Sequence, residues 1–351
     1  MADKLRCAVI GAGGIGADHL HSLNTCHRAA AVALAESNPQ RAREASIRHG
    51  IPRSYSDYRE LLEQPDIDAV TIALPNHLHA PVAIEALKAR KHVLLEKPMA
   101  MNAKEAAKII ETAKAMKRTV MVAQNFRFNR HTQVARLVLD HGDLGELYHI
   151  RCFWLRRAGI PRIGSWFTQK KTAGGGCMYD LGVHLLDTCL HLMKEFDVAT
   201  ISAQTYAKFG PRGLGEMEWG RSDVDPKRPF DVEDYGVALI RLKSGRTISM
   251  EVGWACFQNQ DAREYGIDLY GTNAGLSLFP AKLYRNTIDA QETLQYNSTA
   301  KLPHPEDRVH HFVHSVLDGK KLLVLPEESL KVHQALDALY ASAASGKEVK
   351  L

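Results

Sequence analysis

The sequence predicts an α/β + α+β protein, with an N-terminal domain on a parallel sheet and a C-terminal domain on an open, mostly antiparallel sheet. Three observations lead to this prediction. The chain has 351 residues, enough for two domains that each bury a core. Up to about residue 124, short apolar runs alternate with amphipathic helical segments, whereas strand-like runs dominate beyond it. We therefore expect one domain over residues 1–125 and a second over 126–351.

The elements expected in the first domain alternate as parallel βαβ units do. We expect strands at 7–10, 31–35, 69–74, 92–95 and 119–122, and helices after residue 16 and at 39–49, 58–63, 81–90 and 103–116. Ligands bind such sheets at the carboxyl ends of the strands, where side chains and helix N-termini converge. The segments at these ends, which we expect to form a site, are 11–16, 36, 74–76, 96–98 and 124–125.

The second domain is expected to combine several strands with four helices. The strands are expected at 147–154, 200–207, 235–242, 247–254, 266–270 and 275–278, and the helices at 132–141, 178–193, 307–317 and 328–344. The segment 209–231, rich in glycine, proline and charge, is expected to be a long loop with a functional or mobile role. An open antiparallel sheet leaves one face for a substrate or a second subunit, so we expect a homodimer or a homotetramer.

The most specific motif follows the first expected strand and has the form G-x-G-x-x-G, from Gly11 to Gly16. The first glycine permits a tight turn, and Gly13 lets the backbone approach a pyrophosphate. Gly16 lets the following helix pack against the strand, so that the N-terminal amides of the helix face the anion. With a strand before it and a helix after it, this motif predicts a Rossmann dinucleotide-binding domain in preference to a glycine loop without a ligand.

Glu36 ends the second expected strand, twenty residues after Gly16. A carboxylate at this position accepts hydrogen bonds from the adenosine ribose and repels a 2′-phosphate. Arg41 and Arg43 follow close downstream, where a guanidinium can meet that phosphate, but their place on an expected helix favours exposure to solvent. The sequence therefore predicts NAD as the cofactor in preference to NADP.

Lys97 directly follows an expected buried strand, in the segment Glu96-Lys97-Pro98. Proline restrains the preceding residue to extended conformations and can itself be cis, which would aim the lysine into a cleft. A lysine at the end of a strand is more often a surface residue. Its place beside the dinucleotide motif favours a functional role here.

A second candidate group begins at three glycines, 174–176, and continues with Asp180 and His184. The two side chains lie four residues apart and share a helix face. The glycines allow close approach of another backbone or of a cofactor ring. A histidine can exchange an alcohol proton near neutral pH. Taken alone, the pair fits better an aspartate that serves a helix N-terminus and a half-buried structural histidine.

These motifs, in this order and spacing, resemble the Gfo/Idh/MocA family over essentially the whole chain. The family comprises oxidoreductases related to glucose–fructose oxidoreductase and inositol dehydrogenase. The resemblance implies that Lys97 contacts the reacting oxygen and the nicotinamide ribose. It also implies that Asp180 positions the substrate hydroxyl and that His184 is the general acid and base.

Two further segments are similar to the family. By this resemblance, Asn76 and His79 line the dinucleotide, and Asn125 and Arg127 reach the nicotinamide end or the substrate. The commonest family residue at the ribose position is Asp, and Glu36 keeps its carboxylate. The residues expected to bind the dinucleotide are Gly11, Gly13, Gly14, Ile15, Gly16, Glu36, Ser37, Arg41, Leu74, Asn76, His79, Glu96, Lys97 and Asn125.

Aromatic and cationic residues precede the second candidate group, among them Trp154, Arg156 and Trp166. Flat aromatic faces suit the apolar faces of sugar or cyclitol rings, and arginines suit carboxylates or dense hydroxyls. The two tryptophans can equally pack the core of the domain. The residues expected to contact a polyol, sugar or keto-sugar substrate are Lys97, Arg127, Arg156, Trp166, Asp180 and His184.

The composition bears on location and on partners. The 45 basic and 40 acidic residues form no long run of one sign, which argues against a nucleic-acid partner. The first residues lead directly into a strand, and no apolar run approaches membrane-spanning length. Six scattered cysteines include no C-x-x-C pair. We therefore expect a cytoplasmic protein with reduced cysteines and no membrane partner.

Four histidines, at 304, 310, 311 and 314, raise the question of a metal site. His310 and His314 have a spacing compatible with a metal pair, but the absence of an H-E-x-x-H motif and of a nearby cysteine favours a solvated or interface helix face. Asp180, His184 and Asp187 can also be drawn as a metal-binding set, although a nicotinamide enzyme of this type needs no metal. We expect none.

Three functions are compatible with these observations. The first is an NAD(H)-dependent oxidoreductase that transfers hydride between nicotinamide and a secondary alcohol or ketone of a sugar, a sugar derivative or an inositol. The second is a glycosidase that uses NAD for transient oxidation and elimination, and the third is a non-catalytic regulator that binds a dinucleotide on the same fold. The joint presence of Lys97, Asp180 and His184 argues against a regulator, and we expect the first function.

Overall fold

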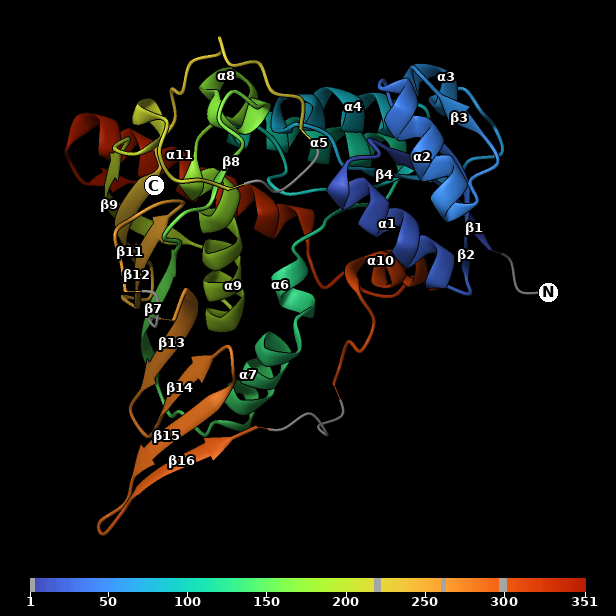
Figure 1. Cartoon of the computed structure of the whole chain (residues 1–351). Helices are drawn as coiled ribbons and strands as arrows, with labels where there is room; N and C mark the ends of the chain where they lie inside the picture. The colour runs from blue at the N-terminus through green and yellow to red at the C-terminus, as the bar shows by residue number, and fades with distance from the viewer. Residues whose placement is uncertain (1–3, 218–221, 260–262, 297–301) are drawn as a thin grey trace. The chain divides into compact units, whose positions relative to one another are not determined.

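The computed structural model describes residues 4–217, 222–259, 263–296 and 302–351. The chain forms two compact units, and Figure 1 labels most of their elements. Unit 1 contains the N-terminal residues up to Gln124, a short segment that ends at Asp223, and Glu306–Leu330. Unit 2 contains the remainder. The expected division at 125/126 differs from these units chiefly because residues 306–330 return to unit 1.

Unit 1 is built on a six-stranded sheet with the order β3-β2-β1-β4-β5-β6, in which every pair is parallel. The strands are β1 (Leu5–Ile10), β2 (Ala29–Ala35), β3 (Ser54–Tyr55), β4 (Ala69–Ile72), β5 (His92–Leu95) and β6 (Val120–Val122). The helices between them are α1 (Gly14–Thr25), α2 (Pro39–His49), α3 (Tyr58–Leu62), α4 (Asn76–Lys88) and α5 (Ala103–Met116). Because β4, which lies between β1 and β5, is buried along its whole length, it behaves as central parallel strands do. The predicted parallel sheet is confirmed.

Two elements of unit 1 differ from the sequence pattern. The two-residue strand β3 was not expected, because so short a pairing carries no period of its own. Helix α4 begins at Asn76, five residues before the expected start, and holds Pro81 inside it. A proline inside a helix removes one amide donor, and for that reason the sequence favoured a later start.

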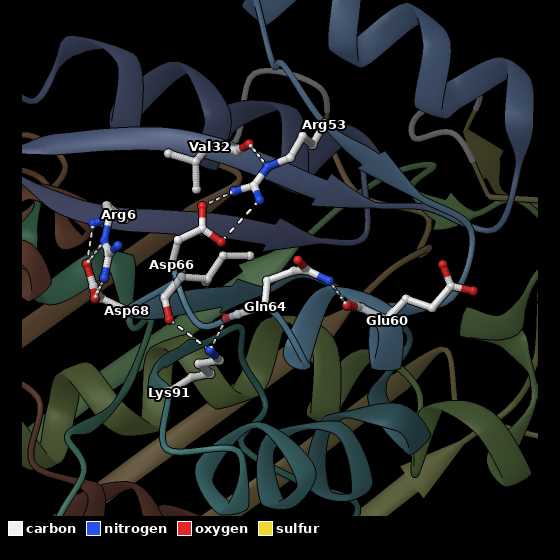
Figure 2. Close-up of polar contacts among 9 residues, drawn as sticks. Arg6, Val32, Arg53, Glu60, Gln64, Asp66, Asp68 and Lys91 are labelled. Carbon is white, nitrogen blue, oxygen red and sulfur yellow. Dashed lines mark hydrogen bonds and ion pairs between the residues drawn. The ribbon is translucent and has the colours of Figure 1, made fainter.

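Polar contacts tie the strands of unit 1 together at their amino ends, as Figure 2 shows. Arg6 of β1 forms a two-point ion pair with Asp68, which directly precedes β4, at 2.8 and 2.6 Å. Lys91, which directly precedes β5, donates through Nζ to the carbonyls of Gln64 and Ile67 at 2.6 and 2.9 Å. These contacts lie at the opposite end of the strands from the glycine motif. The carboxyl ends are thereby left to form a site.

The segment that returns to unit 1 contains α10 (Arg308–Asp318), which packs against α1. Asp307 caps α10 by accepting from the amides of Val309 and His310, and its other oxygen accepts from the Ser22 hydroxyl at 2.9 Å. His310 Nε2 lies 2.9 Å from the Ser22 carbonyl oxygen. His310 therefore belongs to the contact between two helices, in line with the interface helix face that the sequence favoured.

Unit 2 is built on a nine-stranded sheet with the order β16-β15-β14-β13-β7-β12-β11-β9-β17. Neighbouring strands are antiparallel except for β7 and β12, which are parallel. The strands are β7 (Leu147–Leu155), β9 (Val198–Tyr206), β11 (Tyr235–Leu242), β12 (Thr247–Gly253), β13 (Tyr265–Gly271), β14 (Gly275–Leu278), β15 (Lys282–Asn286), β16 (Gln291–Gln295) and β17 (Val349–Lys350). The predicted open, mostly antiparallel sheet is confirmed, although β15, β16 and β17 were not expected. Part of the expected loop 209–231 forms β10 (Glu216–Met217), which pairs with β8 (Ile160–Pro161).

The helices of unit 2 are α6 (Asn125–Phe128), α7 (Arg130–His141), α8 (Lys170–Ala173), α9 (Val183–Met193) and α11 (Pro326–Ser345). Helices α7, α9 and α11 cover one face of the sheet, and Figure 1 shows α7 and α9 along that face. Leu186 of α9 and Leu336 of α11 join Ile240 and Val252 of the sheet in one buried core. Nearly every residue of α9 is buried, as expected for a helix that is apolar on most sides. Among the helices of the described residues, none is both long and apolar enough to cross a membrane.

Candidate active site

The turn between β1 and α1 has no room for a side chain at two of its glycines. A Cβ on Gly11, whose φ is +92°, would lie 2.3 Å from the carbonyl oxygen of Ala73. A Cβ on Gly16 would lie 1.8 Å from the carbonyl oxygen of Gly11. The turn therefore brings α1 directly onto the end of β1, as the motif predicts.

The N-terminus of α1 is shaped to receive an anion. In the described residues, the N-cap position of α1 is Gly13, which has no side chain to cap the helix, and the first turn of α1 holds no acidic residue. A Cβ on Gly13 or Gly14 would find no described atom within 4 Å, so the backbone faces open space here. Uncapped amides at a helix N-terminus bind phosphate oxygens. The residues present therefore fit a dinucleotide pyrophosphate, and the half-exposed Ile15 lies beside them.

Glu36, at the end of β2, is buried against the same turn. Its Oε2 accepts a hydrogen bond from the Ala12 amide at 3.0 Å, and its Oε1 accepts one from the Asn38 amide at 2.9 Å. Arg41 Nη2 lies 3.3 Å from Oε1, whereas Ser37 is exposed. The carboxylate expected to bind the ribose is thus held beside the glycine turn.

Lys97 follows β5, and its peptide bond to Pro98 is cis. The preceding Glu96 turns inward: its Oε2 accepts from the Lys97 amide at 3.2 Å, and its Oε1 lies 2.9 Å from His19 Nε2 and 3.6 Å from Arg308 Nε. Burial raises the pKa of Glu96, but the hydrogen bond to His19 and the charge of Arg308 outweigh it and lower the pKa to about 2. Glu96 is therefore an ionised group that holds the backbone of Lys97, and its expected contact with the dinucleotide stays a prediction.

His79 joins the loops that follow β4 and β5. Its Nδ1 lies 2.6 Å from the Pro98 carbonyl oxygen, and its Nε2 lies 2.7 Å from the Leu74 carbonyl oxygen. Burial lowers the pKa of His79 even though both carbonyls favour the charged ring, so the neutral ring donates to one carbonyl at a time. Because both nitrogens face carbonyls, His79 holds the two loops together, and its expected contact with the dinucleotide stays a prediction. Asn76, at the start of α4, is also buried.

Asp180 and His184 lie on one continuous helix in unit 2. A π-helical turn, Met178–Gly182, carries Asp180, and α9 follows directly with His184 in its first turn. Asp180 Oδ2 accepts a hydrogen bond from the buried indole Nε1 of Trp254 at 3.0 Å. Single π-helical turns are rare and occur frequently at functional sites. The turn and the indole together fix a carboxylate one helical turn before an imidazole.

Aromatic rings gather around His184. Phe126 stacks on the imidazole with the ring centroids 5.0 Å apart, and it lies 5.5 Å from the ring of Trp154. Tyr265 lies 5.3 Å from Trp154, and the guanidinium of Arg156 lies 5.1 Å from the same ring. Phe126, Trp154 and Tyr265 are each partly exposed. Trp154 packs against the core and also belongs to a partly exposed aromatic group beside a candidate acid–base residue.

Arg127 is buried, although the sequence analysis assigned it to the substrate. Its Nε and Nη2 donate to the two carboxylate oxygens of Asp187 at 2.8 and 2.7 Å, and both side chains are fully buried. The ring of Phe196 lies 5.2 Å from the guanidinium. A guanidinium used in this way joins α6 to α9, and the expected contact of Arg127 with the substrate stays a prediction. The same pairing occupies Asp187, one member of the metal-binding set considered from the sequence.

Comparison with known proteins identifies the family of the chain. The family model described as "Oxidoreductase family, NAD-binding Rossmann fold" matches residues 5–124, and the family model of the Gfo/Idh/MocA C-terminal domain matches residues 132–277. The chain belongs to the Gfo/Idh/MocA family. Levoglucosan dehydrogenase in complex with NADH and levoglucosan, a solved structure, is 25% identical, with 99% of both chains covered and a TM-score of 0.86.

Two curated relatives of this Gfo/Idh/MocA protein are sugar dehydrogenases. D-glucoside 3-dehydrogenase of Escherichia coli (strain K12) is 29% identical over 354 residues, which cover 100% of this chain and 98% of that protein. Levoglucosan dehydrogenase of Pseudarthrobacter phenanthrenivorans is 34% identical over 223 residues, which cover 62% of this chain and 57% of that protein. The predictions of a Rossmann domain, an oxidoreductase and NAD as its cofactor are thereby confirmed.

The candidate residues of this Gfo/Idh/MocA protein are divided between the two units. Unit 1 brings together the glycine turn, Glu36 and Arg41, and it also holds Lys97. Asp180, His184, Asn125, Arg156 and Trp166 belong to unit 2. Trp166 stacks on Phe167 with the ring centroids 3.8 Å apart. The roles of these residues stay predictions.

Glu233 holds the glycine run 174–176, and the sequence analysis did not single it out. Its buried carboxylate accepts from the amides of Gly176 and Met178 at 2.9 and 3.0 Å and from the Tyr340 hydroxyl at 2.7 Å. A Cβ on Gly176 would lie 1.8 Å from the Glu233 carbonyl oxygen, and one on Gly175 would lie 2.0 Å from the Tyr340 hydroxyl oxygen. The close approach of another backbone therefore accounts for Gly176. An acidic residue just before the expected strand 235–242 was the available signal for Glu233.

Replacement of Glu96 is expected to change how stability depends on pH. The folded-state pKa of Glu96 is about 2 against an ordinary 4.5, so its ionisation stabilises the fold above about pH 4.5, and this stabilisation is lost as the pH falls toward 2. From about pH 5 to about pH 3, we expect the free energy of unfolding to fall by about 2 kcal/mol more in the unmodified protein than in Glu96→Gln, measured by urea unfolding. The exposed Glu111→Gln should keep the full pH dependence. Parallel curves for Glu96→Gln and the unmodified protein would contradict the assignment.

Replacement of Glu233 is expected to destabilise unit 2. Glu233→Gln turns an amide group toward the donors of Gly176, Met178 and Tyr340, so we expect a loss of about 2–3 kcal/mol in the free energy of unfolding, measured by urea denaturation. Tyr340→Phe removes one donor and should cost about 1 kcal/mol. A loss for Glu233→Gln no larger than that for Tyr340→Phe would show that the backbone contacts carry little weight.

Proposed function

We propose that this protein oxidises a secondary hydroxyl of a sugar, a sugar derivative or an inositol with NAD, and that it also catalyses the reverse reduction. One observation carries the proposal. The same chain contains the glycine turn 11–16 beside Glu36, which we call the dinucleotide cradle, together with Lys97 and the helix that bears Asp180 and His184. Relatives that are D-glucoside 3-dehydrogenase and levoglucosan dehydrogenase support a sugar as the substrate class.

The reaction divides among three side chains. When bound, NAD supplies the acceptor for the hydride. We assign to His184 the removal of the hydroxyl proton and to Lys97 the stabilisation of the negative charge that develops on oxygen. Asp180, held at Oδ2 by Trp254, positions the hydroxyl. In the reverse direction, His184 returns the proton to the ketone oxygen.

The aromatic group around His184 supports a ring-shaped substrate. The partly exposed rings of Phe126 and Trp154 offer apolar faces suited to the C–H face of a sugar. Arg156 lies over Trp154 and pairs with Glu264 at 3.0 Å, which places a cation beside this group. We propose Arg156 as a contact for substrate hydroxyls. Among the described contacts, Trp166 has none with this aromatic group, and its expected contact with the substrate stays a prediction.

A cytoplasmic location completes the proposal. All six cysteines lie in the described residues, and none of them forms a disulfide there. Burial raises the pKa of the Cys177 and Cys189 thiols, which keeps them protonated and inert. Unpaired, buried cysteines suit a reducing compartment.

Loss of either Lys97 or His184 is expected to lower turnover by roughly two to four powers of ten. Without Lys97 the negative charge on the reacting oxygen is not stabilised, and without His184 the hydroxyl proton has no acceptor. The measurement is nicotinamide absorbance with a panel of inositols, aldoses, keto-sugars and aryl glycosides. The variants are Lys97→Ala and His184→Ala, and the exposed Lys108→Ala serves as the control. Near-normal turnover in either variant would reject its assigned role.

The same panel separates the two alternative functions. Cleavage of an aryl glycoside without net formation of NADH would indicate the glycosidase. Tight binding of NADH without turnover of any compound would indicate a regulator. Oxidation of a ring polyol with stoichiometric NADH supports the dehydrogenase.

We further propose that a second copy of the chain covers the open face of the sheet in unit 2. Strands β7, β9, β11 and β12 line a shallow groove of about 510 Å³ on this face, where Leu239 is 47% exposed. Val237 also lines it, together with polar residues such as Ser249 and Glu251. Apolar side chains on an uncovered sheet face favour association with a partner.

A charge placed on this face is expected to reduce the size of the assembly. Leu239→Glu replaces an exposed apolar side chain with a carboxylate that association would bury, so it should convert a dimer or tetramer into a smaller species in sedimentation velocity. Leu137→Glu, at an exposed position of α7, is the matched control and should leave the assembly intact. A monomeric unmodified protein, or a Leu239→Glu variant of unchanged size, would overturn the proposal.

A further inference from the structure

Arg41 places a positive charge beside the acidic residue at the ribose position. The side chain of Asn38 caps α2 by accepting from the amides of Gln40 and Arg41, which fixes the start of the helix. From there, Arg41 Nη2 reaches Glu36 Oε1 at 3.3 Å. A guanidinium at this place is the usual partner of the 2′-phosphate of NADP, so Glu36 and Arg41 by themselves give opposing signals.

Asp223, from a distant part of the sequence, pairs with Arg41 and decides between the signals for NAD and for NADP. Its Oδ1 and Oδ2 accept from Arg41 Nη1 and Nη2 at 3.1 and 3.4 Å, across a sequence separation of 182. Asp223 clusters with unit 1, as Arg41 and Glu36 do. Burial disfavours the charge of Arg41, but the hydrogen bond to Asp223 and the charge of Glu36 outweigh it, and the pKa of Arg41 is raised. The guanidinium thus stays charged and is shared by two carboxylates.

We propose that Asp223 is a specificity-determining residue that makes this protein refuse NADP. With Asp223 present, the group of Glu36, Arg41 and Asp223 carries a net charge of about −1, and both terminal nitrogens of the guanidinium are engaged. A 2′-phosphate, with a charge of about −1.5 to −2, is repelled by this negatively charged group. It also finds both terminal nitrogens of the guanidinium already hydrogen-bonded to carboxylates. The ribose hydroxyls of NAD carry no charge, so Asp223 lowers the affinity for NAD only slightly. The inference rests on the proposed function only in that the cradle binds a dinucleotide.

The exposure of the pair sets the expected size of the effect. Arg41 is 19% exposed and Asp223 is 76% exposed, so water and salt screen their interaction in part. Removal of one exposed negative charge beside a phosphate should therefore change affinity by about tenfold and not by many powers of ten. The change should shrink as ionic strength rises.

The test measures binding of NADPH and of NADH by nucleotide fluorescence, without any sugar. Asp223→Asn keeps the shape of the side chain and removes its charge. We expect it to tighten NADPH binding by about tenfold and to leave NADH binding within about twofold. Asp223→Asn combined with Arg41→Ala should lose the gain, because the freed guanidinium is what receives the phosphate.

Two controls make the outcome decisive. Asp225→Asn removes a carboxylate two residues further along the chain that accepts a hydrogen bond from the Lys227 amide, so it should leave NADPH binding unchanged. An unchanged NADPH affinity in Asp223→Asn, or an equal gain in Asp225→Asn or in the double variant, would overturn the inference while NADH binding stands. Failure of the unmodified protein to bind either dinucleotide would instead remove the proposed function itself.

Discussion

The approach of Gly16 to the carbonyl of Gly11 is the constraint on which the candidate site of unit 1 depends. A Cβ at Gly16 would lie 1.8 Å from that oxygen, so α1 can begin where it does only without a side chain there. With the helix in this place, the amide of the turn meets Glu36. The same helix carries His19 to Glu96, directly behind the lysine that follows β5. One backbone contact thus positions the anion cradle, the ribose carboxylate and the support of the lysine together.

Unit 2 reaches a similar result through two adjacent buried acids. Glu233 holds the glycine run that leads into the π-helical turn, and Asp234 accepts from the amides of residues 208–210 at the start of the long loop. The carbonyl of Asp234 accepts from the amide of Trp254, whose indole holds Asp180. The start of that loop, the glycine run and the carboxylate of Asp180 are therefore joined through a few neighbouring residues. A disturbance of any one of them is transmitted by short hydrogen bonds and not by diffuse packing.

Local patterns explain what the sequence predicted well. The longer strands of unit 1, the glycine turn and helix α10 depend on residues a few positions apart, so period and spacing indicate them. Partners of buried charges cannot be found in this way. Arg127 faces Asp187 and Glu96 faces Arg308, at separations that no local pattern encodes. Asp223 was missed on the same ground, since nothing near it in the sequence points to Arg41.

The return of residues 306–330 to unit 1 has a consequence for the order in which the molecule assembles. The ribosome releases β1 to β6 long before it releases α10, so the parallel sheet emerges without the helix that packs on α1. During that interval the carboxylate of Glu96 has His19 but not Arg308 beside it. The N-terminal unit therefore reaches its native electrostatic balance only after nearly the whole chain has been translated, which ties its maturation to that of the unit made in between.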